Sequence, residues 1–532
     1  MSYTQFDCLQ KTAIILIILS FILWWSGIAG NALYGIPTLF FLISSSILIV
    51  NNRFTVPFLF CFESLSRFTT QKYSQKWIVG FFTVNSIIWL LYGPFQYYSF
   101  ELFTMDVGIY SNHFFNLSRG ELFSSFINVH SYADHFYPSI SFIALFYKIV
   151  PSALWIMLFK AIAYILCPVV IYLICIEVID DPRKARNSSI ITGLLWLLLY
   201  APAVNSMRFE FTPSSLAPPF VFYAFLCMRK KQWWKFFLCM AILVGFKEHM
   251  GAVWIGFGCY LMLARPDRKL GLFLVLSGII IIYVVNFQII PYFNEYRPAP
   301  RVMPLGPFTD IPEKIIYSVK LLIPLLFIPL VFWKNGIIAG PAIGINLISN
   351  YATMYSSHYH YDDVLSSLLL ISVMVSLNEI RFTDLIHRVV TKKSGQFLIV
   401  LWIVFFLALL PYSNIRFVRK RIPSKTSFAV VEELNKFDKL SKGQRISVQG
   451  CLGAHIHRRE IQKIRQTENK SCATHNSLYN SSTGIDYFAF APGLSNFEIP
   501  NMKKCLNDLD EASNYQRVSG FKELVVFKHE EK

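Results

Sequence analysis

The sequence predicts an all-α polytopic membrane protein with about 13 transmembrane helices and a small C-terminal soluble α/β module. Composition is the first reason, because 54% of the 532 residues are hydrophobic and 15% are charged, against about 25% charged in an ordinary soluble domain. The second reason is that the hydrophobic residues form continuous runs of roughly 17–25 residues, which is the length that crosses a bilayer as a helix. Soluble proteins have shorter buried runs and membrane β-barrels have alternating ones, so both classes are excluded.

The predicted spans fall into two groups. The N-terminal unit, 1–76, contains a hairpin of two spans, 12–30 and 33–50, followed by a basic cytoplasmic loop. Segment 12–30 is too long for the apolar core of a typical signal peptide and lacks a clear cleavage site. The membrane domain, 77–412, holds the remaining spans, at 77–95, 152–178, 188–204, 215–228, 232–246, 250–264, 270–291, 315–333, 336–350, 363–378 and 396–412.

The basic residues set the expected orientation. They collect in alternate loops, and cytoplasmic loops carry an excess of Lys and Arg, so these loops are assigned to the cytoplasm. The first large loop, 98–137, and the tail, 413–532, then lie outside. A net charge of +17 needs no nucleic-acid partner, because basic loops beside anionic lipid account for it. One basic cluster falls on the outer side and is expected to contact lipid phosphates: Arg416, Arg419, Lys420, Arg421 and Lys425.

The tail from about residue 425 lacks long apolar runs and is richer in charge. Alternating or short apolar segments predict strands at 445–450, 484–491 and 522–528, and helical periodicity predicts helices at 427–438 and 499–513. The tail also contains Cys451, Cys472 and Cys505. A pair of them would form a disulfide in an oxidising compartment, but three cysteines leave the pairing open.

Charged and imidazole groups gather on the predicted outer side. Such groups are costly near a bilayer and are therefore candidates for function. Lys247 and Glu248 are adjacent, so on a helix their side chains point about 100° apart, and they are also interpretable as a helix-end pair. His358, His360 and Asp362 have a period of two, which allows a divalent-metal site in an extended segment, although a hydrogen-bonded loop is the commoner reason. The full set comprises Asp106, His113, His130, Asp134, His135, Arg208, Glu210, Lys247, Glu248, His249, Glu295, Arg297, Arg301, His358, His360, Asp362 and Asp363.

Five segments, in order, resemble motifs of a bacterial multi-pass family known as domain of unknown function 2079. The first is MDVGIY at 105–110, which is similar to the family's FDLGIFDQ, with Asp106 and Gly108 matching its Asp and Gly. Glu210, Thr212 and His249 depart from the family's Asp, His and Asp. The other four segments are 134–138 (DHFYP), 209–213 (FEFTP), 246–249 (FKEH) and 446–460 (ISVQGCLGAHIHRRE).

The family in turn resembles a branch of the C-type (GT-C) glycosyltransferase superfamily. This resemblance implies a membrane enzyme of the cell inner membrane that takes sugar from a polyprenyl-phosphate donor. It also implies that Asp106, in the long first outer loop, is the essential acid. The position of Asp106 about ten residues past a span, on the face where polar groups gather, agrees independently.

The expected chemistry follows from these roles. Asp106 would accept the proton of an acceptor hydroxyl, on a glycan, lipid or protein, as that hydroxyl displaces the lipid phosphate with inversion. The departing phosphate needs positive charge. Asp106, Glu210, Lys247 and His358 are expected to converge in a cavity about 10–15 Å across. Asp134 and His360 are weak candidates to hold Mg or Mn, and the substrate- or phosphate-binding candidates are Arg208, Glu210, Lys247, Glu248, Arg297 and His358.

Two other functions stay open. One is a transporter or flippase of a lipid-linked glycan, and the other is a non-catalytic envelope assembly protein. The sequence shows no inverted repeat, and its polar groups lie at one face rather than at the bilayer midplane where transporters bind. It contains no zinc pattern, P-loop or dinucleotide fingerprint.

The orientation predicts that a fusion at residue 420 ends outside the cytoplasm. A reporter that fluoresces only in the cytoplasm should therefore stay dark when it is joined there, because the basic loops hold the opposite ends of the spans inside. A fusion in the cytoplasmic loop near residue 231 should fluoresce and serves as the control. A bright reporter at residue 420 would show that the tail faces the cytoplasm.

Overall fold

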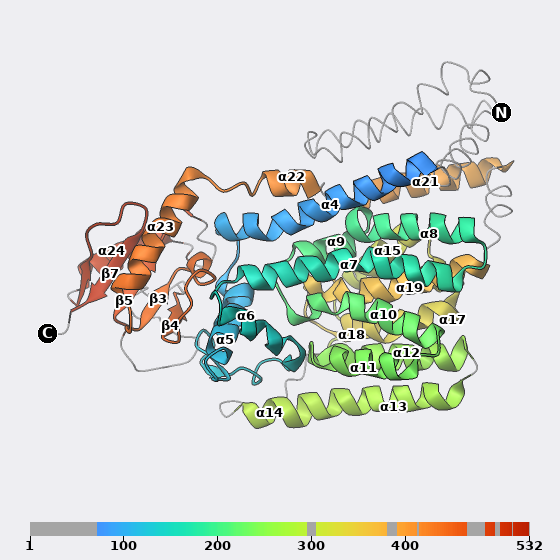
Figure 1. Ribbon diagram of the computed structural model, residues 1–532, viewed down its shortest axis with the longest axis horizontal. Coiled ribbons are helices and arrows are strands. Elements are labelled where there is room, and N and C mark those ends of the chain that lie inside the picture. Colours follow the sequence, from blue (N-terminus) through green and yellow to red (C-terminus); the bar gives the residue numbers. More distant parts are fainter. Residues whose placement is uncertain are drawn as a thin grey trace, which may run out of the picture.

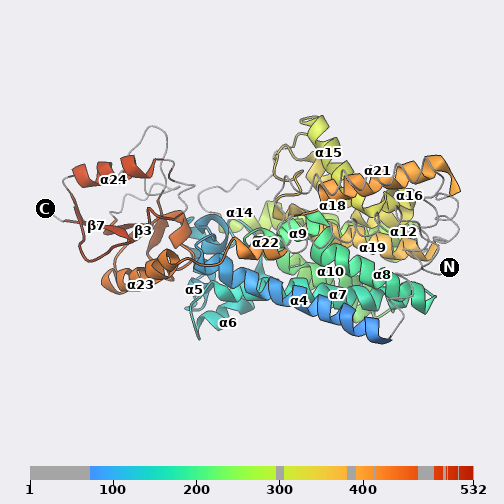
Figure 2. The ribbon, with the colours of Figure 1, turned by 90° about the horizontal axis from the view of Figure 1, so that it is seen from above.

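The structure, a computed structural model, describes residues 72–265, 267–294, 305–379, 391–411, 414–464, 485–494, 499, 501–512 and 514–530. The predicted hairpin spans, 12–30 and 33–50, lie outside the described residues. A bundle of helices makes up most of the molecule, and a small sheet with its own helices lies at one end of the bundle (Figures 1 and 2). The chain is therefore mainly helical with a C-terminal sheet, as the sequence predicts.

Five described helices are long and apolar enough to cross a membrane, judged by length and composition. They correspond to five predicted spans. The helix from His360 to Glu379 is the most deeply buried of them. The five are α4 (Lys72–Tyr98), α7 (Leu154–Val178), α13 with its continuation α14 (Arg268–Val284 and Ile290–Phe293), α19 (Asp363–Glu379) with the preceding turn, and α21 (Lys393–Leu409).

The other predicted spans are shorter or bent, so the described residues do not establish thirteen spans. The span predicted at 188–204 is a pair of helices bent by 47°, which would make a sixth crossing if the pair is one span. Proline explains the break. Pro202 lies in the first turn of the second helix, and because proline has no backbone N–H and its ring clashes with the preceding turn, the first helix cannot run on through it. The elements concerned are α8 (Pro182–Leu194) with a π-helical turn to Leu199, α9 (Ala201–Arg208), α10 (Pro218–Arg229), α11 (Trp233–Val244) and α12 (Gly251–Leu263).

The segments predicted at 315–333 and 336–350 are broken into short helices. Helix α15 (Ile311–Leu322) stops just before Pro324, and Leu326 and Phe327 both have φ of 54°, a left-handed conformation that ends a right-handed helix. The chain then forms α16 (Ile328–Val331), α17 (Trp333–Gly336) and α18 (Gly340–Ile348). Hydropathy detected the apolar run but not these interruptions.

Glycines bring α12 and α13 into direct backbone contact. A Cβ added to Gly258 would lie 2.6 Å from the carbonyl oxygen of Gly271, and one added to Gly278 would lie 2.6 Å from that of Gly251. Small residues at such positions let helices in a membrane pack closely, where dispersion replaces the hydrophobic effect as the attraction.

The first large loop, which was predicted to lie outside, is a folded unit. It begins with a π-helical turn, Thr104–Gly108, continues as α5 (Ile109–Leu117), and closes with a two-stranded hairpin in which β1 (Phe123–Ser124) pairs with β2 (Val129–His130). A short apolar helical segment, Pro138–Tyr147 including α6 (Ala144–Tyr147), leads back to α7.

The C-terminal module contains a five-stranded mixed sheet in the order β4-β3-β5-β7-β6. Strand β3 pairs in parallel with β4 and β5, whereas β7 pairs antiparallel with β5 and β6. Strands β3, β5 and β7 lie where strands were predicted, and helix α23 contains the predicted helix 427–438. The elements are α22 (Asn414–Arg419), α23 (Lys425–Leu440), β3 (Ile446–Val448), β4 (Ile461–Lys463), β5 (Tyr487–Phe490), α24 (Met502–Glu511), β6 (Tyr515–Arg517) and β7 (Val525–His529).

The cysteines of the tail differ in state. Cys505 is disulfide-bonded, whereas Cys451 is a buried free thiol. Cys472 lies outside the described residues.

The module and the outer loop share one hydrophobic core. Apolar side chains of the loop, among them Phe100, Ile109 and Phe126, cluster with Val448 and Leu452 of the module. Burial of side chains from both segments in one cluster joins them into a single packed unit. Figures 1 and 2 both show α5 between the helix bundle and the module.

The basic segment after the last span also contacts the loop. The Nε atom of Arg421 lies 2.5 Å from Oε2 of Glu101, and its guanidinium lies 3.8 Å from the centre of the Phe417 ring. This arginine, predicted to contact lipid phosphates, therefore has an acidic protein partner.

Gly453 tests the packing between module and loop. A Cβ at this position would lie 2.2 Å from Oγ1 of Thr104 and 3.1 Å from the Phe126 ring, so Gly453→Ala should lower the free energy of unfolding by about 1–3 kcal/mol through overpacking. The measurement is the melting temperature of the detergent-solubilised protein. Gly493→Ala is the control, because nothing lies within 4 Å of its added Cβ. Equal melting temperatures for the two variants would contradict this packing.

Candidate functional site

Asp106 lies in the π-helical turn Thr104–Gly108, and Glu210 binds both ends of that turn. Oε2 of Glu210 accepts a hydrogen bond of 2.9 Å from the backbone N–H of Phe103, and the Glu210 carboxylate also accepts from the N–H of Val107. The carboxylate of Asp106 is partly buried, and the turn that carries it is held in place by the Glu210 carboxylate. π-helical turns occur frequently at functional sites.

Lys160 fixes the segment that carries Glu210. Its side chain is 1% exposed, within α7, and its ammonium donates hydrogen bonds to the carbonyl oxygens of Phe209 and Glu210, the second at 2.6 Å. Lys160 was not among the predicted site residues, because it lies inside an apolar run that predicts a membrane span. A lysine within an apolar span is the signal that would have found it.

The Asp106 carboxyl group has a perturbed acidity. Burial raises its pKa to about 6, and the negative charge of Asp134 acts in the same direction. The positive charges of Lys247, Lys160 and Lys463 oppose the rise. The three lysines come from the segment after α11, from α7 and from β4, so parts of the chain far apart in sequence meet around Asp106.

Lys247 is a buried cation among acidic and imidazole groups. It is 5% exposed, and its Nζ atom lies 3.5 Å from Nε2 of His360 and 5.7 Å from the centre of the Tyr361 ring. Its charge also interacts with the carboxyl groups of Asp106, Glu248 and Asp363.

His135 joins two carboxyl groups. Its Nδ1 lies 2.8 Å from Oε1 of Glu248, and its Nε2 lies 3.7 Å from Oδ2 of Asp134. Burial alone would raise the pKa of Glu248, but His135, Lys247 and His249 outweigh it, so this pKa falls below its ordinary value. Burial and Lys247 lower the pKa of His249 to about 4. Glu248 therefore stays ionised and His249 stays neutral at pH 7.

The remaining candidates lie in different places. Arg208 is buried and donates a 2.8 Å hydrogen bond to Oδ1 of Asn414, and its guanidinium lies 4.4 Å from the Phe417 ring centre. Asn414 and Phe417 belong to α22, so Arg208 joins the bundle to the segment before the module. His358 is exposed, and it is His360 that lies beside Lys247. Arg297 lies outside the described residues.

The described part of the chain contains no group of three or more His, Cys, Asp or Glu residues placed to hold a metal ion. Asp134 lies beside His135, and His360 lies beside Lys247. An ammonium group at that distance opposes a divalent cation at His360, because like charges repel strongly where water is scarce. Among the described residues, Lys160 and Lys247 bring positive charge to this site.

The arrangement combines a carboxylate suited to accept a proton near neutral pH with buried ammonium groups suited to bind an anion. The fold is that of a polytopic helical membrane protein with a C-terminal α/β module. Its acidic and basic residues gather where the helix bundle meets this module. Residues 96–448 match the family of predicted membrane proteins designated DUF2079, and the chain belongs to that family. The resemblance predicted from the five motifs is thereby confirmed.

Comparison with other proteins adds a likeness of fold. No curated protein matches the chain. The crystal structure of ArnT from Cupriavidus metallidurans bound to undecaprenyl phosphate is 11% identical, with a TM-score of 0.50, over 85% of this chain and 98% of that chain. The apo structure of the same ArnT is 12% identical, with a TM-score of 0.48, over 86% and 98%. At this identity the likeness concerns the fold alone.

Removing the Glu210 carboxylate should destabilise the turn. Glu210→Ala leaves two backbone N–H groups without their acceptor, so the free energy of unfolding should fall by about 1–3 kcal/mol. Glu210→Gln keeps one carbonyl oxygen as acceptor and should lose less. Thermal unfolding in detergent measures both. If Glu210→Ala has the same melting temperature as the unmodified protein, the turn is held by other contacts.

Proposed function

We propose that this protein transfers a sugar from a polyprenyl-phosphate donor to an acceptor hydroxyl at the outer face of the cell inner membrane, with Asp106 as the general base. The observation that carries the proposal is the surroundings of Asp106: a carboxyl group with a pKa raised to about 6, held on a fixed turn, with the positive charges of Lys247 and Lys160 nearby.

The comparisons support the same class of reaction. The fold that this chain shares with ArnT supports the resemblance of its family to the GT-C superfamily. The ArnT crystal structure contains undecaprenyl phosphate, a polyprenyl phosphate, so the shared fold accommodates such a lipid. A donor of this kind would lie with its lipid chain among the spans and its phosphate near the lysines.

The reaction balances with the residues present. The acceptor oxygen attacks the anomeric carbon of the sugar, and the bond from that carbon to the lipid phosphate oxygen breaks, with its electron pair leaving on the phosphate. The proton of the acceptor hydroxyl passes to the Asp106 carboxylate. Lys247 stabilises the negative charge that develops on the departing phosphate. Direct displacement inverts the anomeric centre.

The raised pKa of Asp106 suits this role. A carboxylate with a pKa of about 6 is a stronger base than an ordinary aspartate and is still mostly ionised at pH 7. Other charged groups act on the site without contacting the acceptor. Glu210 holds the Asp106 turn, and His135 binds Glu248 nearby. Glycan, lipid and protein hydroxyls are all chemically competent acceptors.

Asp106→Asn is the direct test of the base. Asparagine keeps the size of the side chain but cannot accept the proton, so sugar transfer from a polyprenyl-phosphate donor should fall about 100-fold or more. The melting temperature should not fall, because the variant removes a buried charge. The assay uses purified protein with a panel of polyprenyl-phosphate sugars. Near-normal transfer by a folded Asn variant would end the assignment, and no transfer by the unmodified protein with any donor would favour a transporter.

The pH dependence of kcat/KM is a second test of Asp106 as the base. The base is active when ionised, so kcat/KM of the unmodified protein should be constant above pH 7 and fall as the pH drops through about 6. The control is the melting temperature over the same range, which separates loss of base from loss of fold. A kcat/KM that stays level down to pH 5 would contradict Asp106 as the base.

A further inference from the structure

The C-terminal module contacts the turn that carries Asp106. The hydroxyl of Thr104, two residues before Asp106, donates a buried hydrogen bond of 2.7 Å to the carbonyl oxygen of Gly450 in the module. Three residues after Gly450, Gly453 also packs against Thr104, and the threonine side chain leaves no room for a Cβ at position 453. The Thr104 side chain is thus enclosed between its own turn, at Gly108, and the module.

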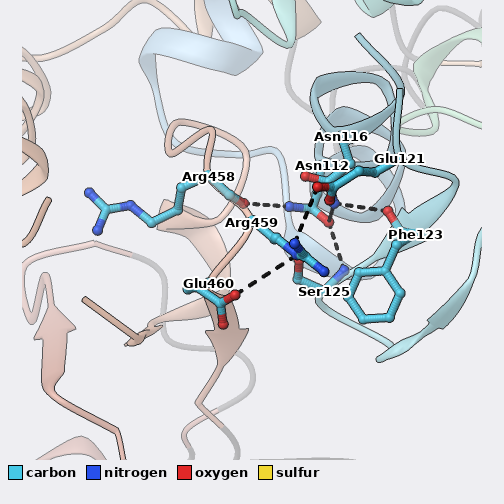
Figure 3. Close-up of polar contacts among 8 residues, drawn as sticks. All are labelled: Asn112, Asn116, Glu121, Phe123, Ser125, Arg458, Arg459 and Glu460. Atoms are coloured by element: carbon cyan, nitrogen blue, oxygen red, sulfur yellow. Dashed lines mark hydrogen bonds and ion pairs between the residues drawn. The ribbon is translucent and has the colours of Figure 1, made fainter. Parts of the chain in front are cut away.

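A second contact fixes the helix that follows the turn. Nδ2 of Asn112 in α5 donates a 2.8 Å hydrogen bond to the carbonyl oxygen of Arg458 in the module, and its Oδ1 accepts one of 2.8 Å from the N–H of Ser125. Figure 3 shows Asn112 between the two segments, with Arg459 of the module 3.2 Å from Glu121 of the loop. Asn112 is 1% exposed, so breaking these bonds would leave buried polar atoms unpaired.

A third contact is aromatic. The His455 ring of the module stacks on Phe100 with ring centres 4.2 Å apart, and lies 4.0 Å from the centre of the Tyr97 ring at the end of α4. Burial lowers the pKa of His455 to about 3, so it is neutral and packs as an aromatic side chain. The contacts therefore bracket Asp106 on both sides, from Tyr97 to Glu121.

The module also brings charge to Asp106. Lys463, at the end of β4, is 7% exposed, and its positive charge acts on the Asp106 carboxyl group. The charged and titratable groups that interact electrostatically with Asp106 include Lys160, Lys247, Lys463, Asp134, Glu210 and Tyr110.

We propose that the C-terminal module completes the catalytic site: Thr104 and Asn112 lock the Asp106 turn onto it, and Lys463 supplies one of the cations beside Asp106. The inference rests on the proposed function, because it assigns Thr104, Asn112 and Lys463 as positioning residues for the same base. Membrane bundle and module together then make one active centre, and neither alone has the full set of groups.

Thr104→Val tests the lock. Valine keeps the branched shape but cannot donate to Gly450, so kcat should fall about 10- to 100-fold through misplacement of the base, with KM for the donor little changed. Thr104→Ser retains the hydroxyl and should recover most of the rate. The melting temperatures of the two variants should differ by only a few degrees. A Thr104→Val protein with the kcat of the unmodified protein would overturn the lock.

Lys463→Met tests the charge. Loss of a positive charge near Asp106 raises the pKa of its carboxyl group, so the acidic fall in kcat/KM should move to higher pH by about half a pH unit. Lys463→Arg should restore its position. Lys528→Met is the matched control, because Lys528 is exposed on β7, which β3 and β5 separate from β4 in the same sheet. An unchanged pH profile for Lys463→Met would overturn the role of Lys463.

A measurement without activity separates this inference from the proposed function. Hydrogen exchange of the intact protein in detergent should be faster over residues 100–112 in Gly453→Ala than in Gly493→Ala, because the module no longer seats on the turn. Faster exchange together with no sugar transfer by the unmodified protein would support the contact between module and turn and contradict the proposed glycosyltransferase activity. Sugar transfer with equal exchange in both variants would keep the enzyme and reject the lock.

Discussion

Charge is expensive where water is scarce, and the arrangement around Asp106 follows from that constraint. Lys160 lies in the apolar interior of α7 and is tolerated because two backbone carbonyl groups accept its hydrogen bonds. Those carbonyl groups belong to Phe209 and Glu210, so satisfying the lysine also sets the place of the Glu210 carboxylate. Glu210 in turn needs donors, and it finds them in the N–H groups at both ends of the turn that carries Asp106.

The same constraint explains why cations and carboxyl groups interleave in this part of the molecule. Lys247 lies among the carboxyl groups of Asp106, Glu248 and Asp363, and His135 lies between Glu248 and Asp134. Each group makes the burial of its neighbour less costly. Because these groups interact, the effects of mutations in this cluster should not be additive.

The sequence predicted the parts of the site that follow apolar runs, where a charged residue is conspicuous. Asp106, Glu210 and Lys247 were singled out in this way, and in the structure Asp106 interacts electrostatically with each of the other two. Lys160 was missed because it lies within a run. The period-two reasoning for His358 and His360 assumed an extended segment, whereas the chain forms a tight helical turn from His360 to Asp362. Strands β4 and β6 were missed because they are three-residue edge strands rich in polar residues. The contact between Thr104 and Gly450 joins residues 346 apart, which local patterns do not reveal.

The glycine contact between α12 and α13 has a consequence for the movement of a lipid. Backbones that touch at Gly251, Gly258, Gly271 and Gly278 leave no width for a hydrocarbon chain, so this pair of helices forms a closed wall. If the proposed polyprenyl-phosphate donor enters sideways from the bilayer, it must therefore pass elsewhere. The segment from α15 to α18 is interrupted by prolines and left-handed residues, so its backbone hydrogen bonds are not continuous. Lateral entry is therefore expected on that side.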